Sequence, residues 1–137
     1  MRYSTAFSTL LLLAAMAATG CDDNTVVTPT EPSPVTISET FSDSLNANGL
    51  RIHAFTVSRA GTVSAQLATL SDPAATVGLS IGTWNGAACQ IVIVNPAAVL
   101  NTTVTGTAQA IGEFCVMLND VGKLTTSVDY SVTVTHF

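Results

Sequence analysis

Charged residues are scarce in this chain of 137 residues, and basic residues are the scarcest. Asp, Glu, Lys and Arg together make up 9% of the sequence, with four basic residues against nine acidic ones. A soluble domain usually has about 25% charged residues. Four scattered bases cannot neutralise a row of phosphates, so we expect no nucleic acid partner. The same shortage argues against attraction to anionic lipid headgroups.

Residues that carry catalytic chemistry are also few. The sequence has two histidines, His53 and His136, and contains no Gly-x-Ser-x-Gly, His-Glu-x-x-His or Cys-x-x-Cys motif. Nucleophilic catalysis needs a base held in place by a third group, and no motif indicates one. We therefore expect no enzyme, no catalytic residue and no cofactor, with His53 at a strand edge and His136 at the terminus. A hydrolase that pairs a serine with one histidine is the alternative.

The acidic residues do not form a metal-binding run. Calcium needs several converging oxygen ligands, and the sequence has no Asp-x-Asp-x-Asp stretch. Most acids fall at predicted turns, where aspartate is favoured for turn geometry alone. We expect no metal site, and the alternative is a calcium site assembled from separate loops by Asp43, Asp72 and Asp120.

The one long apolar run lies near the N-terminus, at residues 10–18. It is shorter than the roughly 20 residues of a membrane-spanning helix and fits the apolar core of a signal peptide. The small residues Ala-Thr-Gly then precede Cys21, which resembles the lipobox of bacterial lipoproteins, although Ala18 stands where leucine is usual. The resemblance implies cleavage before Cys21 and lipid attachment to it. The alternative is an ordinary secretory signal followed by an incidental cysteine.

The stretch after Cys21 predicts a tether. Pro29, Pro32 and Pro34 fall within six residues, and such a segment cannot join a helix or a central strand. We therefore expect a signal peptide at 1–20, a lipidated cysteine with an extended tether at 21–35, and a folded domain at 36–137. Removal of the leader leaves nine acids against three bases, a net charge of 3 − 9 = −6. The implied location is the bacterial cell envelope, facing outside the cytoplasm, on its periplasmic or surface side.

The folded part has the composition and the alternation of β-structure. Threonine fills 21 of 137 positions, and β-branched residues favour strands. Val63, Ala65 and Leu67 alternate with polar residues, and similar rows recur along the chain. Asn85-Gly86 between apolar runs predicts a two-residue hairpin turn of type I′. We expect an all-β, antiparallel sandwich, jelly-roll-like or Ig-like, of seven or eight strands, near residues 40–46, 50–58, 62–70, 77–84, 88–95, 101–108, 112–119 and 127–135.

The same rows resemble a known family. The segments that carry the resemblance are Phe55-Thr-Val57, Ala60-Gly61-Thr-Val63, Leu79-Ser-Ile81, Gly112-Glu-Phe114-Cys-Val116-Met-Leu118 and Asp129-Tyr130-Ser-Val132-Thr-Val134. Their order is similar to that of the bacterial pre-peptidase C-terminal domain. The resemblance implies a jelly-roll-like sandwich that accompanies exported enzymes and in some members binds calcium or an extracellular polymer. No catalytic domain precedes the module in this sequence, so the resemblance leaves the accessory role open, and the family's calcium and polymer sites do not carry over without matching residues.

Two cysteines remain when Cys21 is set aside for lipid. Cys89 and Cys115 each lie in a predicted strand, and exported compartments are oxidising. We therefore predict an intramolecular disulfide between them. The rival interpretation, a metal site, has too few partners among the cysteines and histidines.

Two further features bear on binding. Trp84 is either an exposed contact point or a lid on the core. The apolar stretch 92–100 is either an exposed patch or a buried strand that ends in a turn at Asn95-Pro96. The sequence favours a non-catalytic binding or adhesion module that contacts an extracellular or periplasmic protein or polysaccharide. The alternative is a structural or assembly lipoprotein of the envelope that has no small ligand.

Overall fold

Eight strands account for most of residues 32–137, the part of the chain that the computed structural model describes. That part contains no helix that could span a membrane. The predicted signal peptide, Cys21 and most of the predicted tether lie outside the described residues. The strands are β1 (Ile37–Leu45), β2 (Leu50–Val57), β3 (Gly61–Leu70), β4 (Val77–Trp84), β5 (Cys89–Ala98), β6 (Thr103–Ala108), β7 (Gly112–Asp120) and β8 (Val128–His136).

All eight predicted strands are present, and most bounds agree within one or two residues. The largest differences are at β1, which begins three residues earlier than predicted, and at β5, which ends three residues later. The predicted turn at Asn95-Pro96 is wrong, because β5 continues through Pro96 to Ala98. Proline is tolerated there because β5 is an edge strand, whose outer N–H groups need no partner in the sheet.

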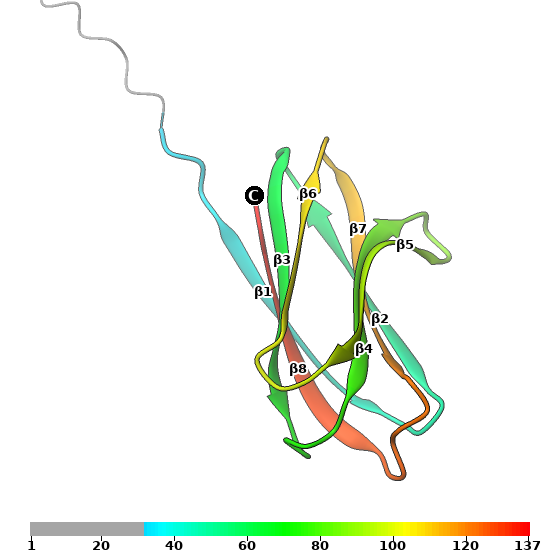
Figure 1. The fold of residues 1–137 in the computed structure, drawn as a ribbon. Helices are drawn as coiled ribbons and strands as arrows, with labels where there is room; N and C mark the ends of the chain where they lie inside the picture. Colours follow the sequence, from blue (N-terminus) through cyan, green and yellow to red (C-terminus); the bar gives the residue numbers. More distant parts are fainter. Residues whose placement is uncertain (1–31) are drawn as a thin grey trace, which may run out of the picture. The chain divides into compact units, whose positions relative to one another are not determined.

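The strands form two antiparallel sheets of four (Figure 1). One has the order β1-β8-β3-β6 and the other β2-β7-β4-β5. Only the β4–β5 connection stays within one sheet, and every other connection in the described part crosses to the opposite sheet. This order is that of a jelly roll, which confirms the predicted all-β sandwich and decides between its two forms.

The core consists of the inward rows that the alternation predicts. Val63, Ala65 and Leu67 of β3 are buried. The inward rows of β4 and β7 face these residues from the opposite sheet, and the inward row of β8 lies beside them in the same sheet. The buried members of these three rows are Val77, Leu79, Ile81, Val116, Leu118, Val128, Tyr130, Val132 and Val134. Phe114 is the one predicted inward residue that stays half-buried. One continuous apolar layer therefore joins the sheets.

Some of the threonines form hydroxyl pairs between strands. On the outer face of the β1–β8 pair, Thr40 Oγ1 lies 3.1 Å from Thr133 Oγ1. Ser38 and Thr135 make the same contact at 3.1 Å one pair along. Such cross-strand pairs stabilise a sheet without any charge, so this surface needs few of the ionic residues that the sequence lacks.

The β4–β5 hairpin is present, but its turn differs from the predicted one. A type I′ turn needs positive φ at both central residues, whereas only Gly86 has it, at φ 91°. The loop contains four residues, because the last paired residues are Trp84 and Cys89. The side-chain oxygen Oδ1 of Asn85 accepts the N–H groups of Ala87 at 3.0 Å and Ala88 at 2.8 Å. This side-chain cap replaces the backbone geometry that the dipeptide suggested.

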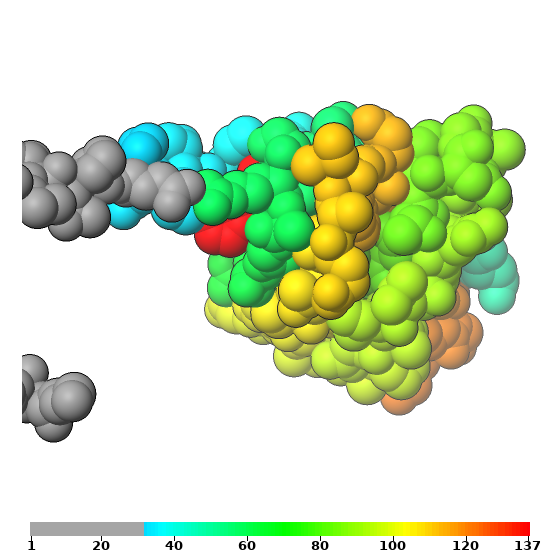
Figure 2. Space-filling view, turned by 90° about the horizontal axis from the view of Figure 1, so that it is seen from above, coloured from blue at the N-terminus to red at the C-terminus, as the bar shows by residue number. Residues whose placement is uncertain are grey.

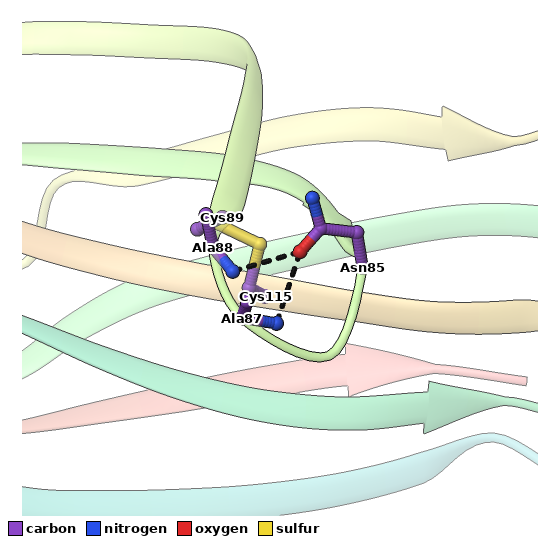
Figure 3. The surroundings of a disulfide bond; sticks show 5 residues. All are labelled: Asn85, Ala87, Ala88, Cys89 and Cys115. Atoms are coloured by element: carbon purple, nitrogen blue, oxygen red, sulfur yellow. Dashed lines mark hydrogen bonds between the residues drawn. A yellow bond between two sulfur atoms is a disulfide. The ribbon is translucent and has the colours of Figure 1, made fainter.

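A disulfide joins the base of this hairpin to β7 (Figure 3). Cys89 and Cys115 are bonded with their Cα atoms 5.8 Å apart, which confirms the predicted pair. Cys115 pairs with Gly82 of β4, and Gly82 pairs with Ile91 of β5 on its other side. A Cβ atom at Gly82 would collide with the backbone of Gln90. The glycine therefore lets β5 curl closely over β4.

We predict that reduction of this disulfide lowers the free energy of unfolding by about 3 kcal/mol, because the bond closes a loop of 26 residues in the unfolded chain. Urea denaturation of the protein with and without reductant measures the difference. The folded, unreduced protein should show no thiol from Cys89 or Cys115 to a thiol reagent. Equal midpoints in both conditions would contradict the prediction.

Candidate functional site

The main cavity is a groove at one end of the sandwich, between the edge strands β5 and β6. It encloses about 410 Å³ and opens beside the β6–β7 turn, at the top of Figure 1. Figure 2 looks onto this end and shows β6 with its turn to β7 beside the β4–β5 hairpin. A volume of 300–1,000 Å³ is typical of sites that bind small ligands or side chains.

The groove floor is apolar and is built from both sheets. Val63 of β3 and Ala108 of β6 face Ile81 of β4, Ile93 of β5 and Phe114 of β7. These residues are the ends of the same inward rows that form the core. The groove is therefore an opening of the core itself, at the place where the two sheets no longer cover one another.

Two large apolar side chains stand at the groove's rim and face solvent. Val92 of β5 is 69% exposed and Ile111 of the β6–β7 turn is 72% exposed. Val92 owes its position to a bulge, because Ile93 pairs with Ile81 and Ile91 with Gly82, which leaves Val92 without a partner on β4. Bulges commonly redirect one side chain toward a site in this way.

Gly106 sets how closely the edge strands approach. A Cβ atom at this position would overlap Cδ1 of Ile93. The glycine thus lets Ile93 of β5 lie against β6 and close the lower part of the space between the edges. The groove remains open above that contact, toward Ala108 and Ile111.

The polar groups of the groove are few and lie among the lining residues Thr83, Thr107, Gln109 and Glu113. Glu113 is the one ionisable residue among them. Its Oε1 accepts a hydrogen bond of 2.8 Å from Thr56 Oγ1 on the neighbouring strand β2. Thr56 and Glu113 face outward, because their neighbours Phe55 and Phe114 face the core. The groove itself is therefore mainly apolar.

His53 lies in a cluster away from the groove, where β1 and β2 meet. Its Nε2 is 2.8 Å from the hydroxyl of Tyr130, and its ring stacks on Phe41 at 5.0 Å. Burial lowers the pKa of His53 and raises the pKa of Tyr130. Burial thus favours the neutral forms of both side chains, which share this hydrogen bond.

His136 lies beside the C-terminus, as the sequence predicted, and it is buried there. Its side chain is 1% exposed at the end of β8, where Nε2 lies 2.9 Å from Oε1 of Glu39. Phe55 packs on the ring at a centroid distance of 5.3 Å. Among residues 32–137, neither histidine hydrogen-bonds a serine, so the structure offers no serine–histidine pair for the hydrolase alternative.

The three aspartates of the calcium alternative have separate partners. Asp43 is paired with Arg51 at 3.1 Å, and Asp72 accepts the N–H of Ala74 at 3.0 Å in its own turn. The described residues contain no group of three or more metal-binding side chains.

Asp120 fastens two loops with its carboxylate. Its Oδ2 accepts the N–H of Asn48 at 2.8 Å. Its Oδ1 accepts three N–H groups from the residues that follow, those of Gly122, Lys123 and Leu124. These bonds, led by that from Asn48, lower the pKa of Asp120. The carboxylate thus holds the turn that the sequence predicted rather than a metal ion.

The two binding features suggested by the sequence have different outcomes. Trp84 is half-buried at the end of β4 and lines no part of the groove. The stretch 92–100 is the exposed patch rather than a buried strand, because Val92, Val94 and Val99 face solvent. Ile111 was missed, although an isoleucine between Ala110 and Gly112 in a predicted turn was a usable signal.

Comparison with known proteins gives structural likenesses only. No protein family model matches the chain, and no curated protein matches it. The Yersinia pseudotuberculosis-derived mitogen superposes with a TM-score of 0.58 at 14% identity, over 75% of this chain and 88% of the mitogen. PliG of Aeromonas hydrophila, a periplasmic inhibitor of g-type lysozyme, superposes with a TM-score of 0.50 at 14% identity, over 71% of this chain and 83% of PliG. These likenesses show a shared fold.

We predict that the stability of the protein falls as the pH drops below about 6.5, in part because of His53. The pKa of His53 is 6.5 in the unfolded chain and lower in the folded one, so the unfolded state takes up the proton first. The contribution is complete above 6.5 and is lost between that value and the folded-state pKa. Urea unfolding at pH 7.5 and pH 5 measures it. His53→Gln, which cannot titrate, should show a smaller loss, and an equal loss in both proteins would contradict the assignment.

Proposed function

We propose that this chain is a membrane-anchored, extracytoplasmic lipoprotein whose β-sandwich is a non-catalytic binding module, and that the groove between β5 and β6 is its contact site. The observation that carries the proposal is the groove itself, with its apolar floor open to solvent and Val92 and Ile111 exposed at its rim. A contiguous exposed apolar surface of this kind commonly marks an interaction site.

The chemistry of the groove favours a protein partner over a polysaccharide. Polysaccharide sites usually present flat aromatic rings, and Phe114 is the one aromatic residue that lines this groove. Phe114 also packs beside Phe55, at a centroid distance of 6.1 Å, within the sandwich. An apolar side chain from another protein suits the remaining lining better, because it can replace water along the aliphatic floor.

The disulfide supports a location outside the cytoplasm. A bond between Cys89 and Cys115 persists in oxidising compartments and is rare where thiols are kept reduced. Lipidation at Cys21 and the membrane anchor rest on the resemblance of residues 18–21 to a lipobox. The resemblance of the folded part to the pre-peptidase C-terminal domain likewise stays a prediction.

A structural or assembly role in the envelope is the second candidate. It is favoured by the free edge of β5, where Val94 is 58% exposed beside the exposed Val92. An apolar edge strand can contact another subunit along its length. The two candidates differ in whether binding follows the groove or the whole edge.

The valines of β5 separate these candidates. We predict that Val92→Glu, which puts a charge at the groove rim, abolishes crosslinking of the protein to its partner in the cells that make it. Val94→Glu is the matched control, because Val94 lies on the same strand, is similarly exposed and does not line the groove. Loss of crosslinking in both variants would favour the edge, and retention in both would count against the groove. Circular dichroism checks that each variant folds.

The anchor has a direct test. We predict that cells incorporate labelled palmitate into the protein and that Cys21→Ser abolishes the incorporation, because the thioether forms on that sulfur. The variant should also be released from the membrane fraction, since the remaining chain carries no lipid. Palmitate label that persists in Cys21→Ser would contradict the assignment, and fractionation of the unaltered protein is the control.

A further inference from the structure

We propose that Asn85 is a site of spontaneous covalent modification, at which the folded protein promotes conversion of the asparagine amide to a carboxylate. The sequence contains two Asn-Gly dipeptides, Asn48-Gly49 and Asn85-Gly86. A glycine after asparagine has no Cβ atom to obstruct the ring closure through which this conversion runs. The sequence therefore does not separate the two asparagines, whereas their surroundings in the structure do.

The reaction uses the backbone of the following glycine as its nucleophile. The N–H group of Gly86 loses its proton to hydroxide, and the nitrogen forms a bond to Cγ of Asn85. The C–N bond of the side-chain amide then breaks, and its nitrogen takes a proton from water and leaves as ammonia. Water opens the resulting succinimide ring at either carbonyl, so the products are aspartate and isoaspartate.

The nucleophile beside Asn85 is free to react. Gly86 is exposed in the β4–β5 loop, and a Cβ atom there would meet no other atom within 4 Å. Among residues 32–137, no protein acceptor takes the Gly86 N–H group. Deprotonation and attack by this nitrogen therefore break no hydrogen bond of the fold, and no side chain obstructs the ring.

The loop also activates the carbonyl that is attacked. Its oxygen, Oδ1 of Asn85, accepts the N–H groups of Ala87 at 3.0 Å and Ala88 at 2.8 Å (Figure 3). When the Gly86 nitrogen adds to Cγ, this oxygen takes the negative charge. Two N–H groups that already donate to the oxygen stabilise that charge, as in an oxyanion hole. The cap that shapes the hairpin thus lowers the barrier to the reaction.

The other dipeptide, Asn48-Gly49, is held in a way that opposes the reaction. The Gly49 N–H is donated to the backbone oxygen of Asn46 at 2.9 Å, and the Gly49 C=O accepts the N–H of Asp120 at 3.0 Å. Attack by the Gly49 nitrogen therefore costs a hydrogen bond of the fold. The Asp120 carboxylate, which accepts the N–H of Asn48 at 2.8 Å, also opposes the build-up of negative charge beside it.

The two products change the loop in different ways. Aspartate at position 85 retains the acceptor oxygen for Ala87 and Ala88 and adds a negative charge. Isoaspartate carries the main chain through Cβ and Cγ, which takes the capping carbonyl into the backbone. The loop belongs to the hairpin whose strands β4 and β5 line one side of the groove. The reaction therefore alters this hairpin slowly and irreversibly, whatever the groove binds.

Incubation of the intact, unreduced protein at mildly alkaline pH tests this inference. Peptide mapping by mass spectrometry measures the conversion of each asparagine, and a protein isoaspartyl methyltransferase detects isoaspartate. In the folded protein Asn85 should convert roughly tenfold faster than Asn48, because the hydrogen-bonded Gly49 N–H raises the barrier. In concentrated urea with reductant the two asparagines should convert at similar rates, since neither loop persists.

Two variants assign the fast reaction. Asn85→Ser keeps an oxygen that can cap the loop but has no amide, so it should abolish the fast conversion. Asn48→Gly, which suits the positive φ of 57° at that position, should leave the conversion of Asn85 unchanged. Circular dichroism checks that both variants fold.

The rates in the unaltered protein decide the outcome. Equal conversion of Asn85 and Asn48 in the folded protein, or faster conversion of Asn48, would overturn the proposal. Conversion of Asn85 that is slower in the folded protein than in urea would also overturn it, because the loop would then protect the amide rather than promote its reaction.

Discussion

The structure depends on the burial of one row of side chains from every strand between two sheets. Because nearly every connection crosses from one sheet to the other, neither sheet can form without the other, and the apolar rows meet only when both are present. The rows are aliphatic, as in Val77, Leu79 and Ile81 of β4, so their burial supplies the main driving force. The outer faces need only satisfy their polar groups, and hydroxyl pairs such as Thr40 with Thr133 do so without charge.

The groove is the place where this layer is left uncovered. The edge strands β5 and β6 belong to opposite sheets, and they approach closely where Ile93 lies against Gly106. Beyond that contact the ends of the core rows face solvent. The disulfide between Cys89 and Cys115 fastens the hairpin that carries β5, so one wall of the opening is fixed to β7. A preformed wall reduces the ordering cost that a partner would otherwise meet on binding.

The sequence predicts what depends on neighbouring residues and misses what depends on distant ones. Alternation identified the strands and the inward rows, and the two cysteines left in the folded part identified the disulfide. The order of the strands follows from packing between segments far apart in the chain, so a jelly roll and an Ig-like sandwich could not be separated. The burial of His136 could not be predicted for the same reason, since it comes from Glu39 and Phe55 on other strands. The type I′ turn failed because the side chain of Asn85 offers a competing cap.

The edge strand β5 favours a contact by side chains over backbone pairing at the proposed site. An uncharged edge with exposed valines would ordinarily recruit another strand. In β5 the bulge at Val92 and the proline at position 96 interrupt the ladder of free N–H and C=O groups, so that added strands find no regular register. The valine side chains of β5 remain exposed, while its backbone is protected from pairing with an added strand. Such an edge keeps an apolar contact available at one end of the molecule and limits assembly along its length, which favours a partner that inserts a side chain over one that adds a strand.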